Sequence, residues 1–165
     1  MNEEDWDPVL IVLPLIVSYF VTFVTGKVEM SGYEQAWFQP PGFIFFIVWT
    51  ALYIMFGFLL YESKRQEDYF TLGLVVGVVF LTYLWQFVFV LDKNYELAMF
   101  VLLLTLALGL VLFVRLYYSK VVNDTSFGEG YLMIYVPFIA WIIFAMFLSS
   151  FTKKSTKKTK RKKKN

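Results

Sequence analysis

Aromatic side chains at helical spacing are the residues of this sequence best able to do chemistry. Phe45, Trp49 and Tyr53 recur at every fourth position, so they would share one face of a helix. Two further stripes of this kind are Leu81-Trp85-Phe89, with Thr82 and Gln86 beside it, and Pro137-Trp141-Ala145-Leu148. Such rings either pack helix against helix or line an apolar cavity, which would suit a flat, hydrophobic ligand with few polar groups. The spacing by itself leaves both interpretations open.

Several classes of site are excluded by composition. The sequence has no cysteine and no histidine, which rules out disulfides, Cys or His nucleophiles and His or Cys ligation of haem iron. No charged residue interrupts the long apolar stretches, whereas proton-coupled pumps and transporters usually keep such residues there as relays. We therefore expect no metal site and no charge-driven transport.

The aromatic stripes lie within segments that suit lipid. Hydrophobic residues make up 59% of the chain, and its mean hydropathy is +0.62. A helix needs roughly 20 apolar residues to cross the hydrocarbon core. Five uncharged stretches meet this need: 8–25, 43–61, 69–91, 97–114 and 131–151. The sequence predicts an all-α membrane protein, a bundle of five transmembrane helices over residues 1–151, followed by a disordered basic tail over 152–165.

The tail sets the predicted orientation, because residues 152–165 supply nine of the fifteen cations. The positive-inside rule places the C-terminus in the cytoplasm and the N-terminus on the other side. The tail either binds anionic lipid or acts only as a topology anchor. Nucleic-acid binding is not expected, since no folded reader accompanies the charge.

The order of the motifs carries a resemblance to a known family. Pro40-Pro41-Gly42 followed by Val48-Trp49-Thr50 and Leu52-Tyr53 resembles the second-helix signature of the TspO/MBR family, the translocator and tryptophan-rich sensory proteins. The stripes of the third and fifth helices resemble the corresponding motifs of that family in both order and spacing. The resemblance extends over nearly the whole chain up to Phe151.

This resemblance implies a membrane translocator or sensor that binds porphyrins such as protoporphyrin IX and, in animal members, cholesterol. The pocket would open toward the cytosol beneath the 26–42 loop, and the porphyrin would be a ligand rather than an obligatory cofactor. The ligand-binding residues implied are Phe38, Pro40, Pro41, Phe45, Trp49, Tyr53, Trp85, Phe89, Ala98, Pro137, Trp141, Phe144, Ala145 and Leu148.

Two further properties follow from the resemblance. Some bacterial members degrade protoporphyrin in light through the tryptophans that match Trp49 and Trp141, but no feature of this sequence shows that reaction. We interpret the chain as a binder first, with a light-dependent enzyme, or a membrane scaffold acting through its tail, as alternatives. Gly73 and Gly77 form Gly-x-x-x-Gly, which either mediates a homodimer, as the family implies, or packs within the monomer.

The chain also departs from the family pattern. Glu34 and Ala36 replace a Lys and a Pro before the double proline, and Phe38 replaces a Trp, so the loop over the pocket diverges. The sterol pattern after the fifth helix has Phe151 in place of Tyr, and the strict matches at Leu59-Tyr61-Lys64 and Leu116-Tyr118-Lys120 are weak evidence. The organelle stays open between endoplasmic reticulum, mitochondrial outer membrane and bacterial plasma membrane.

Overall fold

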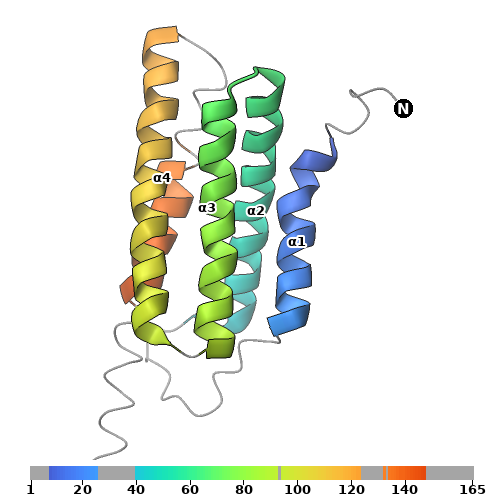
Figure 1. The fold of residues 1–165 in the computed structure, drawn as a ribbon, viewed down its shortest axis with the longest axis vertical. Helices are drawn as coiled ribbons and strands as arrows, with labels where there is room; N and C mark the ends of the chain where they lie inside the picture. The colour runs from blue at the N-terminus through green and yellow to red at the C-terminus, as the bar shows by residue number, and fades with distance from the viewer. Residues whose placement is uncertain (1–7, 26–39, 93, 124–131, 133, 148–165) are drawn as a thin grey trace, which may run out of the picture.

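The part of the chain that a computed structural model describes, residues 8–25, 40–92, 94–123, 132 and 134–147, is helical and contains no strand. The helices are α1 (Val9–Thr25), α2 (Gly42–Arg65), α3 (Tyr69–Phe87) and α4 (Tyr95–Asn123). A π-helical turn, η2 (Val88–Asp92), prolongs α3. Another, η4 (Ile134–Ile139), begins a fifth helix that continues to residue 147. The five helices alternate in direction (Figure 1).

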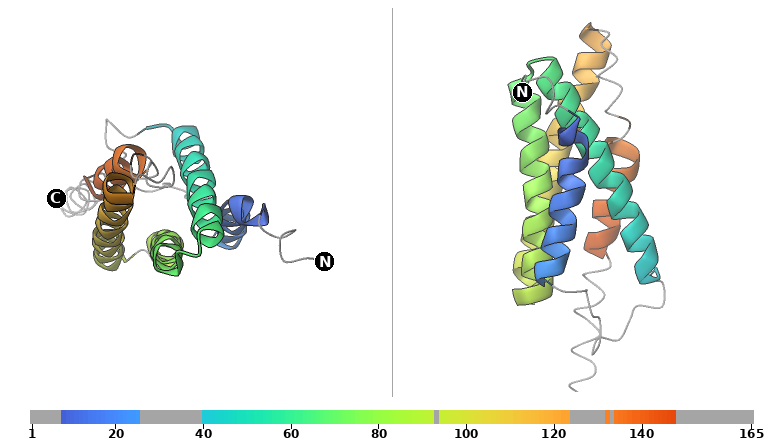
Figure 2. Two further views of the ribbon diagram at one scale, coloured as in Figure 1. Left: turned by 90° about the horizontal axis from the view of Figure 1, so that it is seen from above. Right: turned by 90° about the vertical axis from the view of Figure 1, so that its right-hand side faces the viewer.

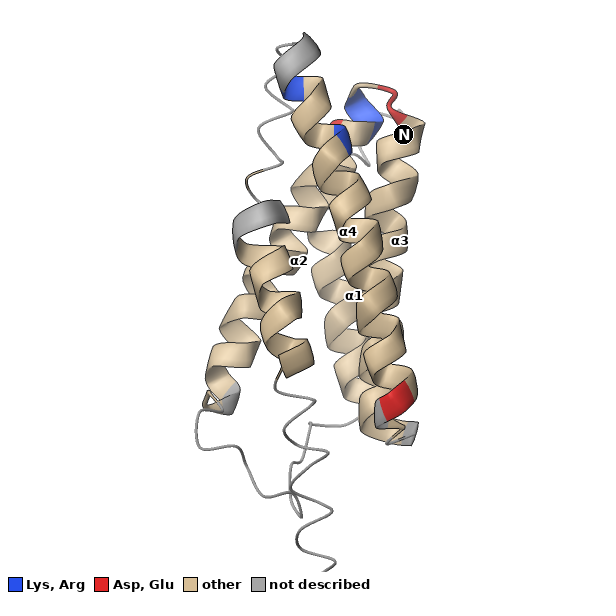
Figure 3. Ribbon diagram, turned by 90° about the vertical axis from the view of Figure 1, so that its left-hand side faces the viewer, with Lys and Arg blue, Asp and Glu red and all other residues tan. Residues whose placement is uncertain are grey.

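Three helical segments are long and apolar enough to cross a membrane: Phe43–Arg65, Tyr69–Leu91 and Glu96–Lys120. Val9–Thr25 and Pro137–Phe147 are apolar but shorter. The charged residues that the structure describes lie toward the two ends of the bundle, and the described residues in its middle are uncharged (Figure 3). Since an uncharged middle suits hydrocarbon and charged ends suit the interfaces, these features agree with an integral membrane protein with transmembrane helices.

The helices extend beyond the uncharged stretches of the sequence. α2 continues to Arg65 and α4 to Asn123, each past the first charged residue that ends its apolar run. Backbone hydrogen bonding carries a helix onward into the interfacial region, where charged side chains meet water. Hydropathy therefore marks the part of a helix that suits hydrocarbon and not the whole helix.

The interior of the bundle lies among α2, α3, α4 and the fifth helix, and α1 lies outside them against α2 and α3 (Figure 2). Its largest fully buried side chains include Phe56, Phe138, Leu102 and Ile142. Phe56 of α2 meets Phe138 of η4 edge to face at 5.0 Å, so a pair of rings joins these two helices.

Polar side chains attach α1 to α3. The Tyr83 hydroxyl donates a hydrogen bond to the Pro14 carbonyl, and the Gln86 amide donates to the hydroxyls of Thr22 and Thr25 at 3.0 and 3.3 Å. In lipid these groups have no water to bond, so partners on a neighbouring helix satisfy them and fix the pairing of α1 with α3.

The turn between α2 and α3 is closely hydrogen bonded. The amide of Asp68 donates to the Ser63 carbonyl and that of Glu67 to Lys64, which is the Schellman pattern for ending a helix. Glu67 takes the left-handed position of this motif, with φ 55°. The Asp68 carboxylate then caps α3 by accepting from the Thr71 amide at 3.1 Å, and it pairs with Arg115 of α4 at 3.1 Å. Asp68 thus joins three helices at this end of the molecule, α2 through its backbone amide and α3 and α4 through its carboxylate.

Candidate ligand-binding site

The predicted aromatic face of α2 lies inside the bundle. The Trp49 ring stacks against Tyr53 one turn along, with centroids 5.6 Å apart. It also stacks against Trp85 of α3, at 6.2 Å and with only 25° between the planes. The predicted i, i+4 spacing therefore does place rings of two helices in contact.

The third helix adds a second ring to this stack. Trp85 stacks on Phe89, with centroids 5.1 Å apart. Phe89 belongs to η2, the π-helical turn that follows α3 directly. A π turn is wider than an α turn and often occurs at functional sites. Here it lies one turn beyond Trp85.

The fifth helix contributes from another side. Trp141 meets Phe45 of α2 edge to face at 5.2 Å and contacts Phe144 at 5.4 Å. A π-helical turn again lies close by, because η4 ends two residues before Trp141. The contacts form two groups of rings: one holds Trp49, Tyr53, Trp85 and Phe89, and the other holds Phe45, Trp141 and Phe144. Phe45 and Trp49 lie on successive turns of one face of α2, so we call the seven rings together the aromatic cluster.

Two polar atoms of the aromatic cluster lack partners. The indole nitrogens Nε1 of Trp85 and Trp141 are buried, and neither has a hydrogen-bond partner among the described residues. Buried polar groups are nearly always paired, and an unpaired one calls for an explanation such as a ligand. The Tyr53 hydroxyl differs, because it donates to the Thr82 hydroxyl at 3.4 Å.

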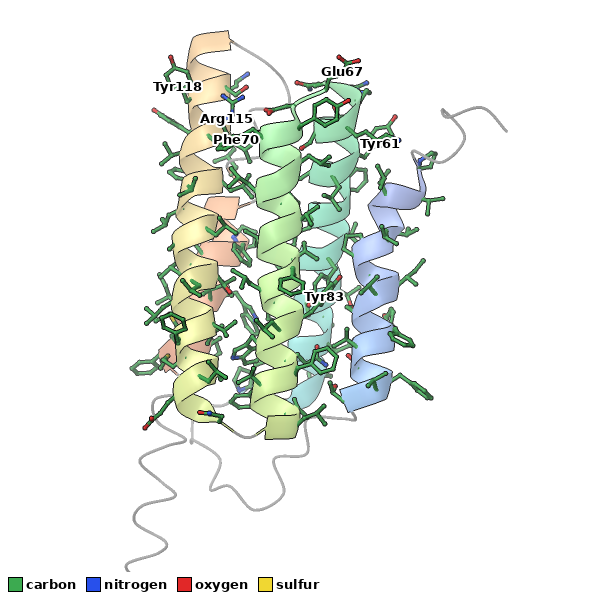
Figure 4. The ribbon with its side chains drawn as sticks, viewed as in Figure 1. Tyr61, Glu67, Phe70, Tyr83, Arg115 and Tyr118 are labelled. Carbon is green, nitrogen blue, oxygen red and sulfur yellow. The ribbon has the colours of Figure 1, made fainter. Side chains whose placement is uncertain are left out.

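Charge is absent from the walls of the aromatic cluster as far as the structure describes them. Glu62, Lys64 and Arg65 lie in the last turn of α2, and Asp68, which caps α3, pairs with Arg115. The exposed Glu96 lies in the first turn of α4. Figure 3 shows charged residues at both ends of the bundle, and Figure 4 shows Glu67 and Arg115 toward the same end. Nor does the described part of the chain contain a group of three acidic, His or Cys residues that could hold a metal ion. The described residues of the aromatic cluster thus offer ring stacking and hydrogen-bond donation.

The other predicted ligand-binding residues have varied positions. Ala98 and Ala145 are buried, and Ala145 belongs to the hydrophobic core. Pro40 is half-buried and Pro41 exposed, directly before α2, and Pro137 is exposed within η4. Phe38 and Leu148 lie outside the described residues.

The sequence model of the TspO/MBR family matches residues 10–153, which cover the five helices apart from Val9, the first residue of α1. The chain belongs to the TspO/MBR family. A relative described as "Tryptophan-rich protein TspO", from Archaeoglobus fulgidus, is 27% identical over 140 residues, covering 79% of this chain and 81% of the relative. Membership of this family supports a role as a membrane sensor or translocator.

Two contacts of this TspO/MBR protein were missed by reasoning from the sequence. Phe56 lies one turn beyond Tyr53 on the same face of α2, so the i, i+3 spacing could have extended the stripe to it. Tyr83 meets Tyr53 with centroids 5.3 Å apart and also bonds to α1. The contacts of Tyr83 could not be predicted from local sequence, because its hydrogen bond depends on where α1 packs against α3.

The glycine pair of α3 is divided between two environments. A Cβ at Gly77 would stand 2.9 Å from Leu108 of α4, so this glycine allows close packing inside the monomer. A Cβ at Gly73 would meet nothing within 4 Å. Gly73, rather than Gly77, is therefore exposed on the surface of the monomer, where the predicted homodimer could use it.

The two strict sterol patterns do not form single surfaces. Leu59 is 3% exposed and Leu116 is fully buried in the core, whereas Tyr118 is 57% exposed. Tyr61 and Tyr118 lie toward the end of the bundle that also holds Arg115 (Figure 4). Because their leucines point into the core, neither pattern offers a sterol all of its residues at once.

Proposed function

We propose that this protein is a membrane sensor or translocator that binds a porphyrin, such as protoporphyrin IX or a related tetrapyrrole, among the rings of the aromatic cluster. The observation that carries the proposal is the contact of Trp49 with Trp85 and of Phe45 with Trp141. These contacts bring rings of three helices around one two-turn stretch of α2. A flat aromatic macrocycle gains most from stacking against such surfaces.

The position of the aromatic cluster supports access from one end of the bundle. Phe45 lies in the first turn of α2 and Phe89 in the turn that follows α3, so both are close to the end at which α1 finishes and α4 begins. We propose that this end faces the cytoplasm, as the basic tail predicts, and that ligand enters there.

The test is a binding titration with protoporphyrin IX on the full chain in detergent or nanodiscs, followed by the Soret absorbance of the porphyrin. Replacing Trp49 and Trp141 together by Leu removes a stacking surface from α2 and from the fifth helix. We expect the affinity to fall by at least about tenfold, since an aromatic pair contributes about 1 kcal/mol beyond its buried area.

The matched control is the double variant Phe58→Leu and Phe80→Leu. Both rings are exposed on the outer surface of the bundle, on α2 and α3, at 47% and 61%. This variant should bind like the natural chain. Equal affinities for the natural chain and the Trp49, Trp141 variant would contradict the proposed site.

Light-dependent porphyrin degradation is a second candidate, because Trp141 contacts Phe45, which lies one turn before Trp49 on the same face of α2. Illumination of the complex, with the Soret band as readout, separates it from binding alone. Bleaching faster than that of free porphyrin, and lost when both tryptophans are replaced, supports the enzyme. Bleaching at the rate of free porphyrin leaves the protein a binder.

A further inference from the structure

We propose that residues 16–25, the second half of α1, form a gate that bends away from the bundle at Pro14 and is held closed by Gln86 of α3. When the gate is open, the seam between α2 and α3 is accessible from the bilayer. The bend itself requires no ligand. Its consequence for ligand entry rests on the proposed function, because this seam borders the aromatic cluster.

Pro14 gives α1 a point at which it can bend. A proline inside a helix has no N–H, so the carbonyl of Leu10, four positions earlier, loses its usual donor. Hydroxyl groups after the proline donate back to carbonyls of α1 itself: Ser18 to Leu15, Thr22 to Ser18 and Thr25 to Val21. Such back-bonding often bends helices, as proline does. The residue types of α1 therefore favour a bend that begins at Pro14.

The first half of α1 is firmly attached. The backbone of Ile11 lies so close to Gly57 of α2 that no side chain fits between them. Leu10 and Leu15, on either side of Pro14, pack against the hydrophobic core. These contacts fix α1 on the bundle up to the point of the bend.

The gate is attached through small side chains. Its buried residues are Ser18, Val21 and Thr25, and none of them belongs to the hydrophobic core that the structure describes. Its large side chains point outward, with Phe20 66% and Phe23 86% exposed. A segment with few buried apolar contacts separates from a protein at a low cost in free energy.

Gln86 holds the gate to α3. Its amide nitrogen donates to the hydroxyl oxygens of Thr22 and Thr25, at 3.0 and 3.3 Å. Thr25 is the last residue of α1, so these groups lie near the interface, where water can replace the bonds that opening breaks. Tyr83, one turn earlier on α3, donates to the Pro14 carbonyl and so holds α1 at the bend (Figure 4).

The closed gate covers the outer side of the seam between α2 and α3. The ring of Tyr19 lies 6.1 Å from that of Phe46 in α2, and Gln86 bonds to the gate from α3. The residues just before these two in the chain, Phe45 and Trp85, belong to the aromatic cluster. One helical position thus separates the gate from the cluster on each helix. The gate lies at the end proposed for ligand entry and gives a flat apolar ligand a route from the bilayer.

Pairs of spin labels on the full chain in nanodiscs measure the bend. The sequence has no cysteine, so labels attach only where one is introduced. One label replaces the exposed Leu104 of α4, and the other replaces either Phe23 in the gate or Val12 in the first half, both also exposed. In Gln86→Leu, the Phe23 pair should gain a component longer by about 5 Å, the displacement for a bend of about 20° at Pro14.

The Val12 pair should keep its distance in Gln86→Leu, which also shows that the variant is folded. Phe80→Leu is the matched control, because it changes an exposed residue of α3 that does not bond to α1. It should leave both distances unchanged. Equal shifts of the two pairs would show that α1 moves as a rigid body, and an unchanged Phe23 pair would show that Gln86 does not hold the gate. Either result overturns the proposal.

Stopped-flow binding of protoporphyrin IX tests the route of entry. A gate changes the rates of binding and leaves the affinity nearly constant. Gln86→Leu removes bonds worth about 1 kcal/mol, so association and dissociation should both become roughly threefold to tenfold faster. A short bifunctional thiol reagent that joins cysteines introduced for Tyr19 and Phe46 should slow both rates, compared with the same variant before cross-linking.

The two measurements separate the gate from the proposed function. A longer Phe23 distance with unchanged binding rates would overturn the role of the gate in ligand entry while leaving porphyrin binding intact. If protoporphyrin IX does not bind at all, the proposed function fails and the role in entry fails with it. The label distances decide whether the gate bends in either case.

Discussion

Gly57 of α2 lies directly against the backbone of Ile11 in α1. A Cβ at Gly57 would stand 1.8 Å from the Ile11 carbonyl oxygen, far closer than non-bonded atoms can approach, so the backbone would have to move. Helices in membranes approach closely where a small residue lets them, because packing replaces the hydrophobic driving force available in water. The position of α1 on the bundle therefore depends on the absence of this one side chain.

Gly57→Ala should destabilise the protein, since the added methyl group must push α1 away from α2. We expect a loss of about 2–3 kcal/mol or more, in the upper part of the range for overpacking. Thermal unfolding in detergent, followed by circular dichroism, measures it. Gly73→Ala is the control, because a Cβ there meets nothing within 4 Å and alanine favours a helix by up to about 1 kcal/mol. Similar melting temperatures for the two variants would contradict the close contact.

Tyr83→Phe removes the hydroxyl that donates to the Pro14 carbonyl and so weakens the attachment of α1 to α3. The expected cost is about 1 kcal/mol, typical of one hydrogen bond between helices. Hydrogen exchange of the α1 amides should rise, because α1 separates from the bundle more often. Tyr69→Phe, also on α3 but 69% exposed, should leave exchange unchanged. Equal exchange in the two variants would show that the bond to Pro14 contributes nothing.

Glu67→Gly should stabilise the protein. Glu67 has a positive φ of 55°, a conformation that costs a residue with a Cβ roughly 1 kcal/mol and costs glycine little. The melting temperature should therefore rise in the glycine variant. Gln66→Gly, one residue earlier, is the matched control: its φ is −92°, so glycine there adds only flexibility to the unfolded chain and should lower stability. A fall in both variants would contradict strain at Glu67.

Acid should weaken the contacts of the Asp68 carboxylate with α3 and α4. Partial burial alone would raise the pKa of this carboxyl, but hydrogen bonds from Thr71 and the charge of Arg115 together outweigh it, so the pKa is lowered. A group whose pKa is lowered on folding stabilises the protein above its unfolded pKa, about 3.9 for Asp. That contribution is lost as the pH falls through the lower, folded value.

The measurement is the melting temperature between pH 7 and pH 2.5 for the natural chain and for Asp68→Asn. The variant should be less stable at neutral pH, because it leaves Arg115 without its carboxylate, and the difference should shrink in acid. A constant difference across this range would show that the ionised carboxylate of Asp68 does not contribute.

Part of the aromatic cluster could be predicted from the sequence. The spacing of Phe45, Trp49 and Tyr53 was enough to place them on one face, and the structure confirms that they meet other rings. Nothing in the sequence indicated that Trp49 would meet Trp85 while Phe45 would meet Trp141. Periodicity fixes the face of each helix, but the rotation and neighbour of that face depend on packing over the whole bundle.

The sequence by itself determined the helical class of the protein, because a bilayer restricts which backbone structures can cross it. Long uncharged stretches with no water to satisfy their amides must become helices, so the helical class and the number of helices could be predicted from composition and length. The tertiary structure decided the rest: the contact of Gly57 with α1, the position of Arg115 beside Asp68, and the two indole nitrogens left without partners in the described residues. These properties depend on the distance between atoms far apart in the chain, a quantity that the local pattern of residue types does not contain.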